Sequence, residues 1–164
     1  MKSAFLRVEH FISTLSLWIA AAMLAVAACL GMTQVLMRFV FEQPSEWSEV
    51  LVRFSLIWMV FLGIPAAFRI GAMVSVDLMH RMAGPRFRRV LDGIIALASL
   101  ALLSVIVWVG WDYAQRGKVQ TMMGLEQISM FWAYIALPIG AAAGMVSVIG
   151  NFLDPINREL ETAQ

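Results

Sequence analysis

The sequence predicts an all-α integral membrane protein with four transmembrane helices in one domain, residues 1–164. Hydrophobic residues make up 61% of the chain and charged residues 14%, whereas soluble domains average about 45–50% and about 25%. The mean hydropathy is +0.80. Four stretches lack any charged residue, and a helix that crosses the bilayer core needs about 20 residues that are mostly apolar. These observations together exclude an ordinary soluble domain.

The first helix is expected at about residues 11–37, where no charged residue or histidine occurs. Lys2 and Arg7 precede this stretch, and a secretory signal peptide is the competing interpretation. The uncharged stretch continues to Met37, however, and the apolar core of a signal peptide is usually about 7–15 residues. We therefore expect an uncleaved transmembrane helix.

The second helix is expected at about residues 46–68. Its uncharged part, 54–68, is shorter than the about 20 residues that a span requires, but a start near Glu46 gives a length of roughly 34 Å. Trp47, Glu49 and Arg53 would then lie at a membrane boundary. Glu49 and Arg53 are four residues apart, on one helix face. Two roles are open for them: an anchor in which they satisfy each other, or contact with a partner or lipid.

The third helix is expected at about residues 93–111, after a basic loop at 69–92 that contains the turn signal Gly84-Pro85. The fourth is expected at about residues 127–153. Small residues recur in it at four-residue spacing, which lets another helix approach closely; they are Ala136, Gly140 and Gly144. This stripe serves packing within the chain or association with another chain. Pro138 should kink the helix because it has no N–H group to donate.

An even number of spans places both termini on one side of the membrane. Eight basic residues fall on that side and four on the other: Lys2, Arg7, Arg69, Arg81, Arg86, Arg88, Arg89 and Arg158 against Arg38, Arg53, Arg116 and Lys118. Because cytoplasmic loops are enriched in Lys and Arg, this distribution predicts an N-in, C-in orientation.

The composition indicates no chemistry of its own. Every carboxylate lies in a loop, a tail or a helix end, and both histidines lie outside the expected spans. One cysteine excludes an intrachain disulfide and a multi-cysteine zinc site. A net charge of +1 without a basic run gives no indication of nucleic acid binding. We expect no catalytic residue, cofactor or metal site, and therefore a non-enzymatic accessory subunit of a larger membrane protein.

Several short motifs resemble a known family. They are RFVF at 38–41, WSE at 47–49, Arg53, Trp58, FLG ending at Gly63, AFRIG at 67–71, the Val76-Asp77 pair, the basic turn at 84–89 and WAYIALPIG at 132–140. Over about residues 15–151 the chain resembles the small membrane subunit (Q subunit, DctQ-like) of the tripartite ATP-independent periplasmic, or TRAP, transporters. Val50 and Met73 depart from the family pattern.

The resemblance implies a partner or lipid interface that includes Arg38, Trp47, Glu49, Arg53, Trp58, Gly63, Arg69, Gly71 and Asp77. It implies two protein partners in the bacterial inner membrane system: a large permease (M) subunit with the substrate and sodium sites, and a periplasmic substrate-binding protein (P subunit) that delivers an organic acid. The small subunit would be a tilted four-helix slab that enlarges the fixed scaffold of a moving transport domain.

Two other functions remain open. A self-contained homo-oligomeric carrier or channel could assemble through the Gly140 and Gly144 stripe, although it would lack an intramembrane charge. A membrane anchor of a redox complex is the other, although the spans contain no histidine to bind haem.

Overall fold

The structure is a computed structural model that describes residues 2–43, 46–70, 85–122 and 125–154. Its main helices are α1 (Lys2–Phe39), α2 (Glu46–Ile70), α4 (Pro85–Arg116), α5 (Phe131–Tyr134) and α6 (Ala136–Leu153). Helices α5 and α6 together form one span, and the four spans are long and apolar enough to cross a membrane. The predicted all-α fold with four transmembrane helices is thus confirmed.

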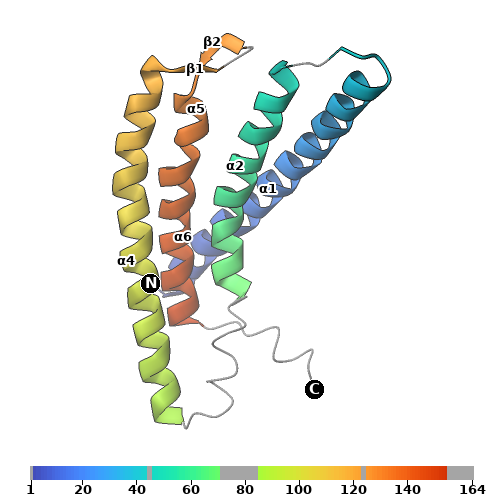
Figure 1. The fold of residues 1–164 in the computed structure, drawn as a ribbon. Coiled ribbons are helices and arrows are strands. Elements are labelled where there is room, and N and C mark those ends of the chain that lie inside the picture. Colours follow the sequence, from blue (N-terminus) through green and yellow to red (C-terminus); the bar gives the residue numbers. More distant parts are fainter. Residues whose placement is uncertain (1, 44–45, 71–84, 123–124, 155–164) are drawn as a thin grey trace.

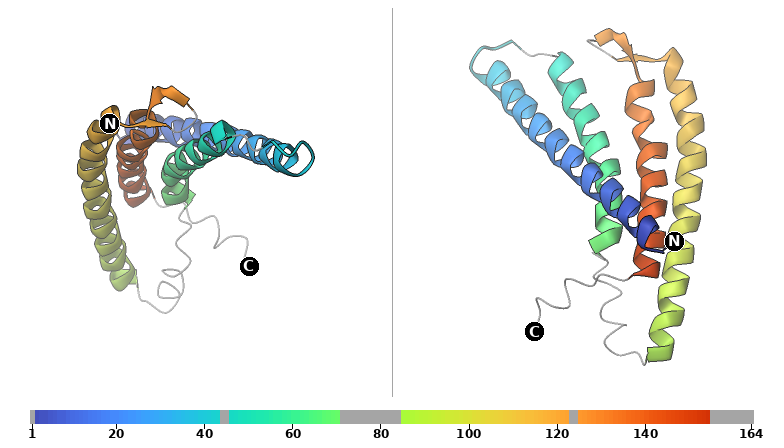
Figure 2. Two further views of the ribbon diagram at one scale, coloured as in Figure 1. Left: turned by 45° about the horizontal axis from the view of Figure 1, so that its top comes forward. Right: turned by 180° about the vertical axis from the view of Figure 1, so that it is seen from behind.

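The helices lie side by side in the order α1, α2, α6 and α4, which differs from their order in the sequence (Figures 1 and 2). Helix α6 therefore occupies an inner position between α2 and α4, and α1 and α4 form the edges. Helix α1 is inclined relative to the other three (Figure 1). This layer agrees with the tilted slab implied by the family resemblance.

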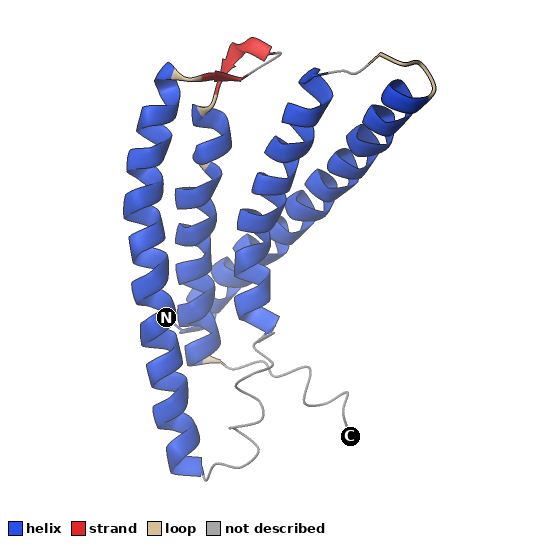
Figure 3. Ribbon diagram, in the orientation of Figure 1, coloured by secondary structure: helices blue, strands red, loops and turns tan. Residues whose placement is uncertain are grey.

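The slab has two distinct ends. We call the end that holds the start of α1, the end of α2, the start of α4 and the end of α6 the terminal end (Figure 1). The opposite end is the ribbon end, because two short strands lie there (Figure 3). The 3₁₀ turn η1 (Gly117–Val119) leads into β1 (Thr121–Met122), which pairs antiparallel with β2 (Leu125–Ser129).

Two helices are longer than expected. Helix α1 begins at Lys2 instead of near residue 11, and α4 covers Pro85–Arg116 instead of 93–111. Residues 85–92 of the expected loop are therefore helical. Proline is favoured in the first helical turn because an N–H group there would have no acceptor within the helix, so its absence costs nothing. Charge-free length measures the apolar core of a span, and a helix continues beyond that core where its polar residues meet water.

The expected helix at 127–153 is divided in the structure. Residues 125–129 form β2, and the span then begins at Phe131 and is interrupted at Ile135. Pro138 cannot donate a hydrogen bond to the carbonyl of Tyr134, four residues earlier, and α5 ends at Tyr134. The interruption thus lies at the place where the proline breaks the hydrogen-bond ladder.

The buried faces of the helices carry mostly small side chains. On α1 they recur every three, four or seven residues, as Glu9, Ser13, Ser16, Ala20 and Ala27. Large apolar residues of the same helix point outward, and Trp18 is 72% exposed. Small residues let helix backbones approach closely, and the resulting van der Waals packing favours helix association in lipid. A cluster around Leu103, Ala141 and Val148 joins α4 to α6.

Candidate functional site

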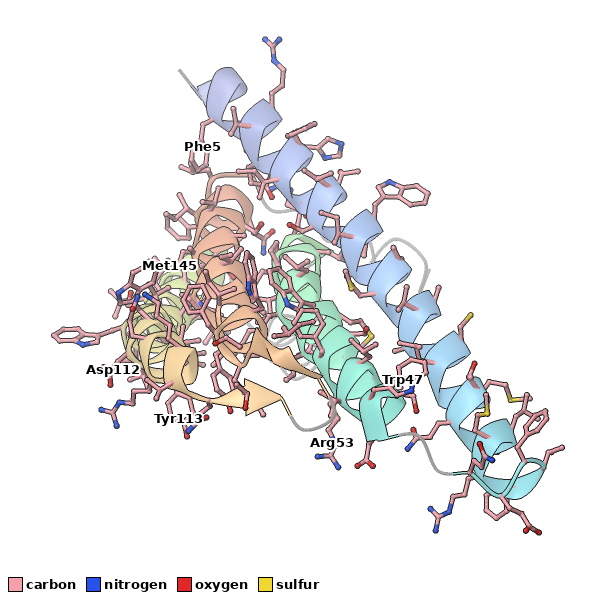
Figure 4. The ribbon with its side chains drawn as sticks, turned by 90° about the horizontal axis from the view of Figure 1, so that it is seen from above. Phe5, Trp47, Arg53, Asp112, Tyr113 and Met145 are labelled. Carbon is pink, nitrogen blue, oxygen red and sulfur yellow. The ribbon has the colours of Figure 1, made fainter. Side chains whose placement is uncertain are left out.

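The ribbon end presents an exposed ion pair on α2. Arg53 Nη2 contacts Glu49 Oε1, four residues earlier in the same helix. The Arg53 and Glu49 side chains are 73% and 50% exposed. Arg53 points away from the other helices (Figure 4), and Trp47 beside it is 43% exposed. These three predicted interface residues are accessible to a partner or to lipid headgroups.

Two further predicted interface residues lie at the middle of α2 and in the last turn of α1. The indole Nε1 of Trp58 donates a hydrogen bond to the carbonyl oxygen of Trp132 at 3.0 Å, which ties α2 to α5. Arg38 lies in the last turn of α1, with its guanidinium carbon 5.7 Å from the centre of the Phe39 ring. Trp58 is therefore partly engaged within the chain, whereas Arg38 is exposed.

Arg69 occupies a different environment at the terminal end. Its Nε lies 3.2 Å from Oε2 of Glu9 on α1. Its Nη1 donates to the carbonyl oxygen of Asp154 at 3.1 Å, and its Nη2 to the Asp154 carboxylate at 3.4 Å. One guanidinium on α2 thus contacts the start of α1 and the residue that follows α6. We call these three residues the charge cluster.

Glu9 is the most deeply placed member of the charge cluster, with a side chain that is 0% exposed. It lies directly on the backbone of α6 at Gly150, where an added Cβ would come within 2.7 Å of the Glu9 Cγ and 2.9 Å of its Cδ. Any side chain at residue 150 would occupy the space of this carboxylate. Gly150 therefore forms the floor of the charge cluster.

The predicted small-residue stripe faces α2. A Cβ at Gly140 would collide with the Phe61 backbone, 2.6 Å from its carbonyl carbon, and one at Gly144 would lie 2.7 Å from Ile64 Cγ2. Ala136 and Pro138 are also buried. In the structure the stripe is thus occupied by a helix of the same chain.

Gly63 behaves differently from these glycines. A Cβ there would meet nothing within 4 Å, so no described residue packs closely against Gly63. The remaining predicted interface residues, Gly71 and Asp77, lie outside the described residues, as do His80 and Met73.

The charge cluster positions helices, and the exposed ion pair on α2 provides surface charge. The described residues contain no group of three or more His, Cys, Asp or Glu side chains that could hold a metal ion. The charge cluster joins three helices, and the exposed pair on α2 leaves its charges accessible. Such an arrangement suits a membrane subunit that contacts other proteins.

The comparison with known proteins identifies the family. Residues 27–158 match the family described as tripartite ATP-independent periplasmic transporters, DctQ component. The chain belongs to the DctQ family. It is thus a transporter component and a multi-pass membrane protein.

Three curated proteins are 25–28% identical to this chain over the residues that align. The sialic acid TRAP transporter small permease protein SiaQ of Vibrio cholerae is 28% identical over 120 residues, 73% of this chain and 66% of the relative. The C4-dicarboxylate TRAP transporter small permease protein DctQ of the same species is 25% identical over 165 residues, 86% and 71% of the two chains. The isethionate TRAP transporter permease protein DctMQ of Oleidesulfovibrio alaskensis is 27% identical over 95 residues, 57% of this chain and 15% of the relative.

Sequence reasoning missed most of the charge cluster of this DctQ-family chain. It selected Arg69 but not Glu9, Gly150 or Asp154. Glu9 lies two residues before the long uncharged stretch and Asp154 directly follows another, so their positions at helix ends gave a signal. The sequence carries no information, however, on which helix ends meet across the slab.

Proposed function

We propose that this chain is the non-catalytic scaffold subunit of a sodium-coupled secondary transporter for organic acids. In this role it supports a large permease subunit and the docking of a periplasmic substrate-binding protein. Membership of the DctQ family carries the proposal. The partner subunits, the sodium coupling and the class of substrate belong to the proposal itself.

The names of the relatives support the substrate class and the large partner. They refer to sialic acid, C4-dicarboxylates and isethionate, which are all organic anions. This chain matches only 15% of the DctMQ permease protein, so that relative carries a much longer chain beside the part that corresponds to this one. A separate large permease would supply the corresponding part here.

The packing of the helices supports a fixed role. Charged residues in the four spans lie near the helix ends, and Arg69 on α2 contacts Glu9 on α1 and Asp154, the residue after α6. The small-residue faces of α1, α2 and α6 are used for packing between these helices. A subunit whose charges and close contacts hold its own helices together is suited to be a rigid frame.

The exposed apolar side chains of the two edge helices support association of the slab with another membrane protein. Helices α1 and α4 expose large apolar side chains over most of their length, and the exposed fraction reaches 81% at Trp108. In a membrane such faces meet lipid or the helices of another subunit. We propose the N-in, C-in orientation in the inner membrane, which the distribution of basic residues supports.

Reconstitution tests this function. Proteoliposomes would contain this chain alone, the cognate large permease alone, or both, each with and without the binding protein, and uptake of candidate organic acids would be followed with and without a sodium gradient. We expect uptake only in the complete mixture with sodium. Uptake by this chain alone would contradict the scaffold role, and uptake by the permease without this chain would show that it is dispensable.

A further inference from the structure

The most buried member of the charge cluster, Glu9, has one cation within ion-pair distance among the described residues, Arg69. Glu9 has no exposed side-chain surface, and neither of its carboxylate oxygens has a hydrogen-bond donor among the described residues. The Arg69 Nε lies 3.2 Å from Oε2, which is within ion-pair distance although the angle is unfavourable for a hydrogen bond. Glu9 is therefore held mainly by the charge of Arg69.

Arg69 has a second task at the end of α6. Its two terminal nitrogens contact the carbonyl and the carboxylate of Asp154, the residue directly after that helix. A cation at a helix C-terminus also interacts favourably with the helix dipole. Because a guanidinium carries donors in a fixed fork, one side chain can serve Glu9 and Asp154 at once. A lysine ammonium lacks this geometry.

The two carboxylates differ in what happens when Arg69 is lost. The Asp154 side chain is 55% exposed and can be solvated by water. Glu9 is enclosed by α1, α2 and the backbone at Gly150, where a Cβ would already collide with it. An ionised carboxylate left in that position without a cation is strongly destabilising. Movement of the start of α1 away from α2 and α6 would return this carboxylate to a polar environment.

We propose that Arg69 is an electrostatic latch that holds the start of α1 in the slab. Glu9 makes the docking of α1 conditional on this one guanidinium: with Arg69 present α1 is fixed to α2 and α6, and without it the buried carboxylate drives the start of α1 out. The latch sets the position of an edge helix and hence the face that the slab presents. It is a property of the isolated chain and stands independently of the transport role.

The test is a double-mutant cycle on the full chain purified in mild detergent. Arg69→Gln removes the cation, Glu9→Gln removes the buried charge with little change of shape, and the double variant removes both. We expect Arg69→Gln to lower the thermal midpoint by about 10 °C. Glu9→Gln should lower it much less, and the double variant should recover at least half of the loss. Arg69→Lys should be intermediate because the charge remains without the fork.

Hydrogen exchange then locates the effect. In Arg69→Gln the amides of residues 5–14 should exchange at least about tenfold faster than in the unmodified chain, while those of residues 96–107 on α4 stay unchanged. The double variant should restore slow exchange at 5–14. Arg116→Gln is the matched control, since that arginine contacts Asp112 four residues earlier on its own helix, and it should alter neither segment.

Two outcomes would overturn the latch. If Arg69→Gln has the same effect with glutamate or glutamine at residue 9, the two side chains are not coupled. If exchange at 5–14 stays slow in Arg69→Gln, the start of α1 is held by other contacts. Should Arg69→Gln fail to accumulate in the membrane, the relative yield of the double variant decides. A yield restored by Glu9→Gln supports the latch, and an equally low yield contradicts it.

Discussion

At the terminal end Arg69 contacts carboxylates that come from outside its own helix, whereas at the ribbon end Arg53 and Arg116 each contact a carboxylate four residues away on the same helix. The first arrangement exists only when α1, α2 and α6 are packed. The second persists in any single helix. The ion pairs at the terminal end therefore form only in the folded chain, whereas the charged side chains at the ribbon end remain accessible to other molecules.

The energies of the two arrangements differ accordingly. Exposed pairs contribute about 0.2–1 kcal/mol each, and both ribbon-end pairs have side chains that are at least half exposed. Breaking a buried pair by removal of one partner costs about 3–5 kcal/mol, because the remaining charge stays buried. Similar ion contacts in one small membrane subunit thus join helices at one end and leave accessible surface charge at the other.

After the loss of Arg69 itself, the largest effect is expected from Gly150→Ala, which also tests the terminal end. The added methyl group would lie 2.7 Å from the Glu9 Cγ, and Glu9 cannot retreat without leaving Arg69. We expect the free energy of unfolding in detergent to fall by about 1–3 kcal/mol. The measurement is the thermal midpoint of the purified chain, followed by tryptophan fluorescence.

Two variants control this prediction. Gly63→Ala adds the same methyl group where nothing lies within 4 Å, and it should leave the thermal midpoint unchanged or raise it slightly. The double variant Glu9→Ala, Gly150→Ala should lose less stability than the two single variants lose in sum. In the double variant the added methyl group meets no carboxylate. Additive losses would show that Gly150 does not act through Glu9.

Contacts within one helix could be predicted from the sequence, whereas contacts between distant helices could not. Hydropathy located the four spans because the bilayer imposes a length on each apolar stretch. The Glu49 and Arg53 pair was predictable because the spacing of residues on one helix is fixed. Contacts between distant helices have no such rule: Glu9 and Arg69 are 60 positions apart in the sequence, and their meeting depends on the lateral order of the helices.

Helix ends were predicted less well than helix cores, for a related reason. Absence of charge marks the hydrocarbon region, but the hydrogen-bond ladder of a helix continues into water, as at residues 85–92 of α4. Residues 127–129 were predicted to be helical because they lack charge, yet they belong to β2, in which Ser129 pairs with Thr121 of β1. That pairing depends on a partner strand, which hydropathy does not reveal.

At the ribbon end, Gly117→Ala is expected to have the next largest effect. A Cβ there would lie 2.7 Å from Tyr134 Cδ2 and 3.0 Å from the Phe131 amide nitrogen. Because the nearest atoms include backbone, the 3₁₀ turn η1 must shift, and we expect a loss of about 1–2 kcal/mol. The thermal midpoint and the rate of tryptic cleavage after Lys118 measure it. Gly31→Ala, where a Cβ has open space, is the control; equal changes in both variants would contradict the prediction.

A smaller effect is expected from Trp58→Phe, which removes the hydrogen bond to the Trp132 carbonyl while keeping most of the ring. The loss should be about 1 kcal/mol. Trp18→Phe makes the same change on a side chain that is 72% exposed, and it should leave the thermal midpoint unchanged. If both variants lose the same stability, the contact between α2 and α5 contributes nothing measurable.

The smallest effect on stability is expected from Glu49→Ala, and this variant divides cohesion from recognition most sharply. The isolated chain should lose no more than about 0.5 kcal/mol, because the pair with Arg53 is exposed and lies within one helix. If α2 contacts the proposed large permease here, co-purification of the two subunits in mild detergent should fall several-fold while membrane insertion stays normal.

The matched variant is Asp112→Ala, which breaks the corresponding pair with Arg116 on α4. A loss of partner confined to Glu49→Ala would assign recognition to α2, an equal loss in both variants would extend it across the ribbon end, and normal complexes in both would leave these pairs as membrane anchors only.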